Sequence, residues 1–257
     1  MKVADLYSLT DKVAVVTGAR RGIGAAIALT YAEAGAHVAM CDIEMADGEL
    51  DAVAQKINEL GRKSLALKAD VSVNTDVQYV VRKTIEEFGR IDILVNNAGS
   101  GKGTRLLETT EEDWDHTLAV NLKGTVLFCR EVGKHMVERQ SGCIINIAAI
   151  GGLKAIRDYV RPYAAAKAAV IMLSREFARE VGPFNVRVNA IAPGGIRTEL
   201  TRSIWGDPER LKQATAGTFM GRMAEPEEVA SVALFIAGEG AAWITGQVIR
   251  VDGGALA

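Results

Sequence analysis

The segment Tyr163-Ala-Ala-Ala-Lys167 places a phenol and an ammonium group four residues apart. On a helix, residues at this spacing share one face, so the two side chains would lie close together. A cation beside a phenol favours the phenolate, so the tyrosine could give a proton to an alcohol oxygen or take one from it. The pair predicts the acid–base group of an oxidoreduction at an alcohol or carbonyl carbon. The alternative is a solvated surface pair, the usual role of Tyr and Lys at this spacing.

A glycine cluster, in the sequence TGARRGIG, is the second chemical signal. It follows the apolar run Val13–Val16 and precedes a helical pattern that begins at Ile23, so backbone N–H groups at the helix start could bind a phosphate. Gly18 permits the tight turn, Gly22 lets the backbone approach a diphosphate, and Gly24 permits close packing of helix and strand. The cluster, with Ile23, predicts a dinucleotide site; an ordinary strand–helix turn is the alternative.

Asp42 ends the second apolar run, 24 positions after Gly18. A carboxylate at this place can accept both ribose hydroxyl groups of an adenosine, and its charge would repel a 2′-phosphate. Arg20 and Arg21, inside the glycine turn, could neutralise such a phosphate. Because Asp42 stands at the more decisive position, we expect NAD to be preferred over NADP.

Two further run ends add to the predicted cofactor site. Asp70 and Val71 end the third run, where a side chain could hydrogen-bond an adenine edge. Asn97, Ala98 and Gly99 end the fourth, where small residues let a cofactor lie against the backbone.

Strand and helix patterns alternate along the whole chain and would position these residues. Repeated strand–helix units with right-handed crossovers give a parallel sheet covered by helices on both faces. We expect one α/β domain over residues 1–257, a doubly wound parallel sheet of about seven strands. Expected strands are 13–16, 37–41, 63–68, 91–95, 143–147, 186–191 and 247–251; expected helices include 47–60, 75–88, 111–137, 162–181 and 226–236.

Composition excludes several other classes of protein. A net charge of −2 over 257 residues gives no electrostatic reason to expect a nucleic acid or an anionic membrane as partner. No run approaches the ~18 apolar residues of a membrane span, and the first twelve residues lack the apolar stretch of a signal peptide. Three widely spaced cysteines without metal-ligand spacing fit a reducing compartment, so we expect a cytoplasmic protein without a metal.

Taken together, the motifs resemble the short-chain dehydrogenase/reductase (SDR) family, in its subfamily of shorter chains, over essentially the full length. This resemblance implies a Rossmann-type fold, a nicotinamide cofactor, a small alcohol or ketone as substrate, and a homotetramer. The matching pieces are TGARRGIG, Asp42, Asp70-Val71, NNAG from Asn96, Asn121 in AVNLKG, YAAAK, Pro193-Gly194 followed by Ile196 and Thr198, and VDGG from Val251.

The resemblance also implies a role for each matched residue. Tyr163 would be the acid/base, Lys167 would favour the phenolate and bind the nicotinamide ribose, and Asn121 would hold the water of a proton relay. A helical lid around residues 196–222 would cover the site. Contacts with the cofactor at its nicotinamide end are implied for Pro193, Gly194, Ile196 and Thr198.

One catalytic position departs from the family pattern. The family has a serine at the end of strand five, where this chain reads INIAAIGG with Ala149 at the serine's place. That serine donates a hydrogen bond to the substrate oxygen, and losing such a donor costs about 3–4 kcal/mol. Either the substitution is a deliberate inactivation, or another hydroxyl replaces the serine, or the protein is a weakly active relative. Ser100 and Tyr159 are the nearest substitute donors; a loop contact and a wall of the substrate pocket are their alternative roles.

The residues of the predicted lid bear on the substrate. The lid offers Trp205 with Arg202 and Arg210, which suits neither a purely apolar nor a purely anionic ligand. A cyclic or secondary alcohol is favoured over a 3-oxoacyl thioester and over a sugar acid, although RDYVRPYAAAK resembles the gluconate-type dehydrogenases. The competing class is an NAD-binding sensor or scaffold that has lost its chemistry. Ala149 favours that class, whereas Tyr163 and Lys167 favour an enzyme.

Overall fold

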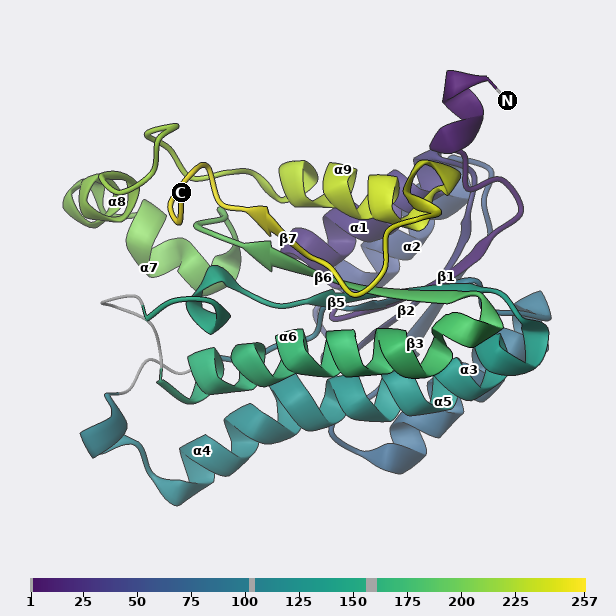
Figure 1. The fold of residues 1–257 in the computed structure, drawn as a ribbon, viewed down its shortest axis with the longest axis horizontal. Coiled ribbons are helices and arrows are strands. Elements are labelled where there is room, and N and C mark those ends of the chain that lie inside the picture. Colours follow the sequence, from purple (N-terminus) through teal and green to yellow (C-terminus); the bar gives the residue numbers. More distant parts are fainter. Residues whose placement is uncertain (1, 102–104, 156–160) are drawn as a thin grey trace.

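The computed structural model describes residues 2–101, 105–155 and 161–257, whose strands form one parallel sheet (Figure 1). The sheet has seven strands in the order β3-β2-β1-β4-β5-β6-β7, so the strand order reverses between β1 and β4. Such a switch point is where doubly wound sheets bind ligands, beyond the carboxyl ends of the strands. The strands are β1 (Val13–Thr17), β2 (His37–Asp42), β3 (Ser64–Lys68), β4 (Ile93–Asn96), β5 (Gly142–Ile147), β6 (Val186–Pro193) and β7 (Val248–Val251).

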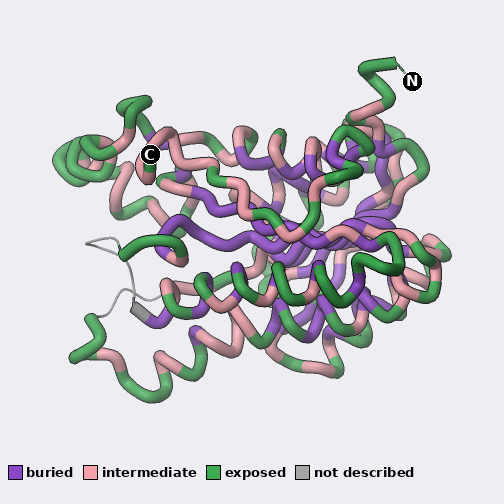
Figure 2. The backbone as a smooth tube through the Cα atoms, viewed as in Figure 1, coloured by how far each residue is buried: buried purple, intermediate pink, exposed green. Residues whose placement is uncertain are grey.

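Helices cover both faces of this sheet (Figure 1). One layer holds α1 (Gly22–Glu33), α2 (Glu49–Glu59) and α9 (Pro226–Ala237); the other holds α3 (Asn74–Phe88), α5 (Gly124–Arg139) and α6 (Arg161–Val181). Every residue of β1 is at most 2% exposed, which explains why its sequence is an unbroken apolar run. Figure 2 shows the buried residues concentrated along the sheet and the helix sides that face it. The predicted Rossmann-type fold is confirmed.

The long helical pattern of residues 111–137 is not one continuous α-helix. Two α-helices, α4 (Glu111–Leu118) and α5, are joined by the π-helical turn η3 (Ala119–Lys123). A π-turn inserts an extra residue, a feature that hydrophobic periodicity does not reveal and that is frequent at functional sites. Asn121 lies at the centre of this turn.

Two short helices, α7 (Arg202–Trp205) and α8 (Pro208–Thr215), lie beyond the carboxyl end of β6 (Figure 1). Part of the segment after β6 is therefore helical. Within the described ranges, no helix is long and apolar enough to cross a membrane, and no group of three or more His, Cys, Asp or Glu side chains could hold a metal. All three cysteines are buried free thiols.

Candidate active site

The glycine turn leaves room only for backbone. Gly18 and Gly22 have φ angles of +62° and +59°, which side-chain-bearing residues rarely adopt. A Cβ on Gly18 would lie 2.7 Å from the Cα of Ala98, and a Cβ on Gly24 would overlap the carbonyl oxygen of Gly18. Gly24 therefore lets α1 begin directly against the turn, with its first N–H groups beside the carboxyl end of β1.

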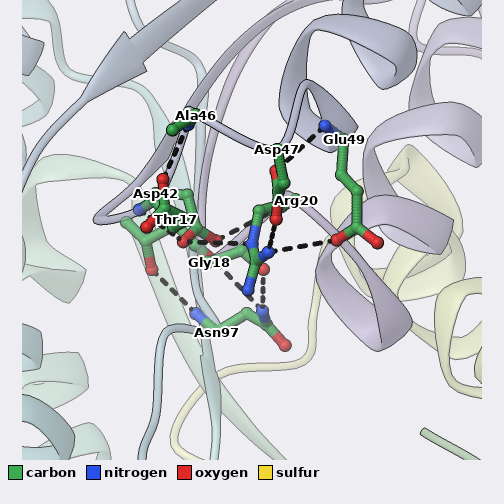
Figure 3. Close-up of polar contacts among 9 residues, drawn as sticks. Thr17, Gly18, Arg20, Asp42, Ala46, Asp47, Glu49 and Asn97 are labelled. Atoms are coloured by element: carbon green, nitrogen blue, oxygen red, sulfur yellow. Dashed lines mark hydrogen bonds and ion pairs between the residues drawn. The ribbon is translucent and has the colours of Figure 1, made fainter. Parts of the chain in front are cut away.

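Asn97 and Thr17 tie the glycine turn to the end of β4 (Figure 3). The Asn97 amide Nδ2 donates to the carbonyl oxygens of Thr17, at 3.0 Å, and of Gly18, at 2.9 Å. The Thr17 hydroxyl accepts the backbone N–H groups of Asn97 and Ala98, both at 3.0 Å. The Asn97 side chain, predicted to contact the cofactor, thus holds the turn. The sequence analysis does not assign a role to Thr17. The available signal is a polar residue directly after the apolar run Val13–Val16.

Asp42 lies at the end of β2 beside the glycine turn. Its Oδ2 accepts the backbone N–H of Arg20 at 3.4 Å, and its Oδ1 lies 3.7 Å from the Arg20 Nε. Arg20 also forms ion pairs with Asp47 and with Glu49 (Figure 3). Arg21, by contrast, is exposed. The two arginines of the glycine turn, both of which could neutralise a phosphate, therefore lie in different surroundings.

The two residues after β3 that were expected to meet the cofactor, Asp70 and Val71, also make contacts within the chain. Oδ1 of Asp70 accepts both the N–H and the hydroxyl of Ser72, at 2.8 and 2.7 Å. The Val71 side chain is buried against α5, where a Cβ added at Gly124 would lie 2.8 Å from its Cγ2. A ligand at this strand end would therefore meet the backbone of Val71 rather than its side chain.

Tyr163 and Lys167 lie one turn apart on α6, with the Lys167 Nζ 5.4 Å from the centre of the Tyr163 ring. Lys167 is 3% exposed, and its Nζ donates to the carbonyl oxygen of Ile147, at the end of β5, over 2.7 Å. Burial disfavours the charged form and lowers the pKa of Lys167 to about 8. The predicted pair is therefore a buried amine beside a half-buried phenol rather than a solvated surface pair.

Asn121 brings the π-turn to the same place. Its Nδ2 donates to the carbonyl oxygens of Ser100, at 2.7 Å, and Thr117, at 2.9 Å. Its Oδ1 is buried and has no hydrogen-bond partner among the described residues, and a Cβ on Gly99 would lie 2.8 Å from it. This oxygen is an acceptor that a water or a ligand hydroxyl would satisfy.

Ala149 follows β5 and precedes the short helix η4 (Ile150–Gly152). A Cβ on Gly152 would lie 2.7 Å from the backbone of both Lys167 and Ala168, so η4 packs directly on α6. Position 149 is thus close to the tyrosine–lysine helix but offers only a methyl group, which is 3% exposed.

Of the two substitute donors, only Ser100 belongs to the described part of the chain. Its hydroxyl oxygen is buried and has no partner among the described residues. The neighbouring Gly101 would carry a Cβ 3.7 Å from the Tyr163 ring. The segment holding Ser100 therefore runs past both Asn121 and Tyr163. Tyr159 lies outside the described residues.

The loop after β6 carries the next group of predicted cofactor residues. Gly194 donates its N–H to Val251 at 2.9 Å immediately after Pro193 ends the strand. Ile196 is buried and forms a parallel bridge with Ala224. The loop is therefore fixed to its neighbours along its length.

Thr198 lies opposite the glycine turn, because a Cβ on Gly22 would be 3.3 Å from its Cγ2. Trp205 donates its indole N–H to the carbonyl oxygen of Thr198 over 2.8 Å. The polar atom of Trp205, a predicted substrate residue, therefore ties α7 to the loop.

These features fit a nicotinamide dinucleotide. The glycine turn offers a backbone cradle at the start of α1, and the Asp42 carboxylate stands beside it at the end of β2. The side-chain oxygens of Ser100 and Asn121 have no partner among the described residues, and the segment of Ser100 lies against Tyr163. Fold and site together define a dinucleotide-dependent oxidoreductase of the doubly wound α/β class.

The chain belongs to the short-chain dehydrogenase/reductase family. A family model described as enoyl-(acyl carrier protein) reductase matches residues 18–255. A solved short-chain type dehydrogenase/reductase from Mycobacterium marinum superposes with a TM-score of 0.94 at 34% identity, covering 99% of each chain.

Curated relatives of similar length have several named activities. A 3-oxoacyl-[acyl-carrier-protein] reductase of Chlamydia trachomatis is 42% identical, over 96% of this chain and 98% of that one. A D-threitol dehydrogenase of Mycolicibacterium smegmatis is 41% identical, over 96% and 94%. An NAD-dependent glycerol dehydrogenase of Listeria innocua is 38% identical, over 96% and 95%. All are named as oxidoreductases, and they differ in substrate.

Proposed function

We propose that this protein interconverts a secondary alcohol and a ketone with NAD, using Tyr163 as the acid/base. The observation that carries the proposal is the burial of Lys167 beside Tyr163, 5.4 Å from the ring centre. Burying an ionisable amine costs free energy, because the amine loses its contact with water. Its placement beside a half-buried phenol is therefore better explained by a catalytic role than by the packing of a surface pair. Tyr163 would protonate or deprotonate the substrate oxygen.

The remaining residues of the site would orient the substrate and cofactor. A bound nicotinamide supplies or accepts the hydride at the substrate carbon. Lys167 would bind the nicotinamide ribose and favour the phenolate, and the orphan Oδ1 of Asn121 would hold a water that carries the proton onward. Because Asn121 also holds the Ser100 carbonyl, it would fix the segment that lies against Tyr163.

NAD is proposed as the preferred cofactor because of the charges at the end of β2. Asp42 accepts a hydrogen bond from the backbone N–H of Arg20. The guanidinium of Arg20 is already paired with the carboxylates of Asp42, Asp47 and Glu49. A 2′-phosphate would bring further negative charge to this place, whereas a ribose with two hydroxyls would donate hydrogen bonds to Asp42.

For the substrate, we favour a small polyhydroxy or other secondary alcohol. The relatives named for threitol and glycerol support this class, and the relative named for a 3-oxoacyl thioester supports the second candidate. The helices α7 and α8 would form the lid over this substrate. We also propose that the protein forms a homotetramer and that it is cytoplasmic.

A second candidate function, an NAD-binding protein without turnover, is favoured by one observation. Position 149 carries a methyl group where the family donates a hydrogen bond to the substrate oxygen. The deciding experiment is a screen of secondary alcohols with NAD and ketones with NADH, run on the native protein and on Ala149→Ser. NAD binding without turnover in both proteins would support the second candidate.

A further inference from the structure

Arg20 leaves the glycine turn and enters a group of carboxylates between β2 and α2 (Figure 3). Its side chain is 15% exposed and forms ion pairs with Asp42, Asp47 and Glu49. The contact with Asp42 is the longest, 3.7 Å from Nε, whereas Nη1 contacts Asp47 and lies 3.2 Å from the Glu49 carboxylate. One edge of the guanidinium is therefore held by two carboxylates that are not part of the predicted cofactor site.

The start of α2 fixes both of these carboxylates. Asp47 is at the helix start, where its Oδ1 accepts the backbone N–H of Glu49 at 3.1 Å and its Oδ2 contacts Arg20. Glu49 is the first residue of α2. Gly48, between them, has a φ of +74°, which sets the direction in which the helix begins. The clamp on Arg20 thus belongs to a regular element and not to an isolated surface contact.

This arrangement has a consequence for the charge that a cofactor would meet. Three carboxylates and one guanidinium leave a formal charge of −2 within the cluster. With Nη1 held by Asp47 and Glu49, the guanidinium of Arg20 could turn as a whole towards a 2′-phosphate only by breaking these two ion pairs. A phosphate would then compete with carboxylates that are already in place, and like charges close together disfavour binding.

We propose that Asp47 and Glu49 are positioning residues for cofactor specificity, holding Arg20 so that it is not available to a 2′-phosphate. The inference rests on the NAD preference proposed above, but assigns part of that preference to residues that act through Arg20 and not to Asp42 alone. Releasing Arg20 should admit NADP without weakening NAD.

The test is the double variant Asp47→Asn with Glu49→Gln, with the affinities of NAD⁺ and NADP⁺ measured by calorimetry on the full chain. Asn preserves the hydrogen bond at the helix start, so α2 should remain intact. NADP⁺ affinity should rise about tenfold, the effect of gaining one charge-assisted contact, while NAD⁺ affinity stays within about twofold. Each single variant should give part of the gain, which keeps the test decisive if the double variant is unstable.

Two further variants separate release of Arg20 from a general loss of negative charge. Glu44→Gln removes a charge from the same loop, where Glu44 accepts the N–H of Ala46, and should leave the NADP⁺ to NAD⁺ ratio unchanged. Arg20→Ala, added to the double variant, should abolish the gain. A gain that survives Arg20→Ala, or that Glu44→Gln reproduces, would overturn the proposal, as would no gain in any variant. If the native protein bound NADP⁺ more tightly than NAD⁺, the proposed NAD preference would be wrong. The effect of Arg20→Ala on the gain would still show whether Asp47 and Glu49 act through Arg20.

Discussion

The Lys167 amine lies 5.4 Å from the centre of the Tyr163 ring and donates a hydrogen bond to Ile147 at the end of β5. The lysine therefore connects the helix that carries the phenol with the strand that ends at position 147. Because Lys167 is buried, its pKa is lowered and it loses its proton at a lower pH than an exposed lysine would.

We expect this burial to appear in the pH dependence of stability. The unfolded chain keeps the lysine proton up to a pKa near 10.5, whereas the folded protein releases it from about pH 8. Between these values the unfolded state binds more protons, so this group makes the free energy of unfolding rise with pH, by at most roughly 3 kcal/mol. Below pH 8 both states are protonated and the contribution is flat.

The measurement is denaturant unfolding of native protein and Lys167→Met from pH 7 to 10.5. The native protein should gain stability relative to the variant as the pH rises through this window. A difference that is independent of pH, or that falls, would mean that the folded lysine keeps its proton.

Ala149→Ser should raise kcat/KM by roughly a hundredfold, because it restores a donor to the substrate oxygen. The affinity for NAD should stay nearly constant, since the missing interaction belongs to the transition state. Adding Tyr163→Phe should remove the gain, because a serine at 149 polarises the oxygen but supplies no proton. Steady-state kinetics and NAD titrations on the three proteins make the comparison.

Ser100→Ala is the matched test for a substitute donor. The Ser100 hydroxyl is buried without a partner in the described part of the chain, so the substitution should leave packing intact. If Ser100 already replaces the serine, this variant loses activity and Ala149→Ser gives little. We expect the opposite pattern, with a small effect of Ser100→Ala and a large gain from Ala149→Ser.

Asp42→Ala should narrow the difference in affinity between NAD and NADP. The variant removes both the acceptor for the ribose hydroxyls and the charge that repels a 2′-phosphate. NAD affinity should fall and NADP affinity should rise, as measured by calorimetry. Native protein that binds NADP more tightly would contradict the premise.

Asn97→Ala should weaken NAD and NADP equally. Its amide makes two hydrogen bonds that hold the glycine turn against β4, so the loss disorganises the cradle for the shared diphosphate and leaves the adenosine end unaffected. Removing two such bonds should also cost on the order of 2 kcal/mol of folding stability. A selective loss of one cofactor would show that Asn97 contacts the ligand directly.

In the proposed homotetramer, we expect the outer face of α6 to be buried between subunits. Ala165 and Ala168 are exposed on this helix, and Met172 is 52% exposed. Met172→Glu should therefore lower the mass measured by light scattering, because it places a charge in an apolar contact. Gln78→Glu, which adds the same charge at an exposed position of α3, is the control and should leave the mass unchanged. A native protein that is monomeric at micromolar concentration would remove this prediction.

Much of the fold followed from the sequence alone. Strands buried on both faces require unbroken apolar runs, and β1 is such a run in the sequence and is fully covered in the structure. The glycine turn is equally direct, because Gly18 and Gly22 adopt backbone angles that residues with a side chain rarely adopt. The spacing of Tyr163 and Lys167 likewise placed both side chains on one helix face.

Only the tertiary structure decided how the side chains of the site are used. The pattern of residues 111–137 could not reveal the π-turn at Asn121, because one extra residue in a turn barely alters the hydrophobic period. The sequence also does not show that the Asn97 amide holds the glycine turn or that Trp205 donates its N–H to Thr198. The ion pairs of Arg20 with Asp47 and Glu49 are likewise visible only in the structure. Local sequence determines where a strand ends and a helix begins, but hydrogen bonds and ion pairs between distant segments depend on how the packed elements bring those segments together.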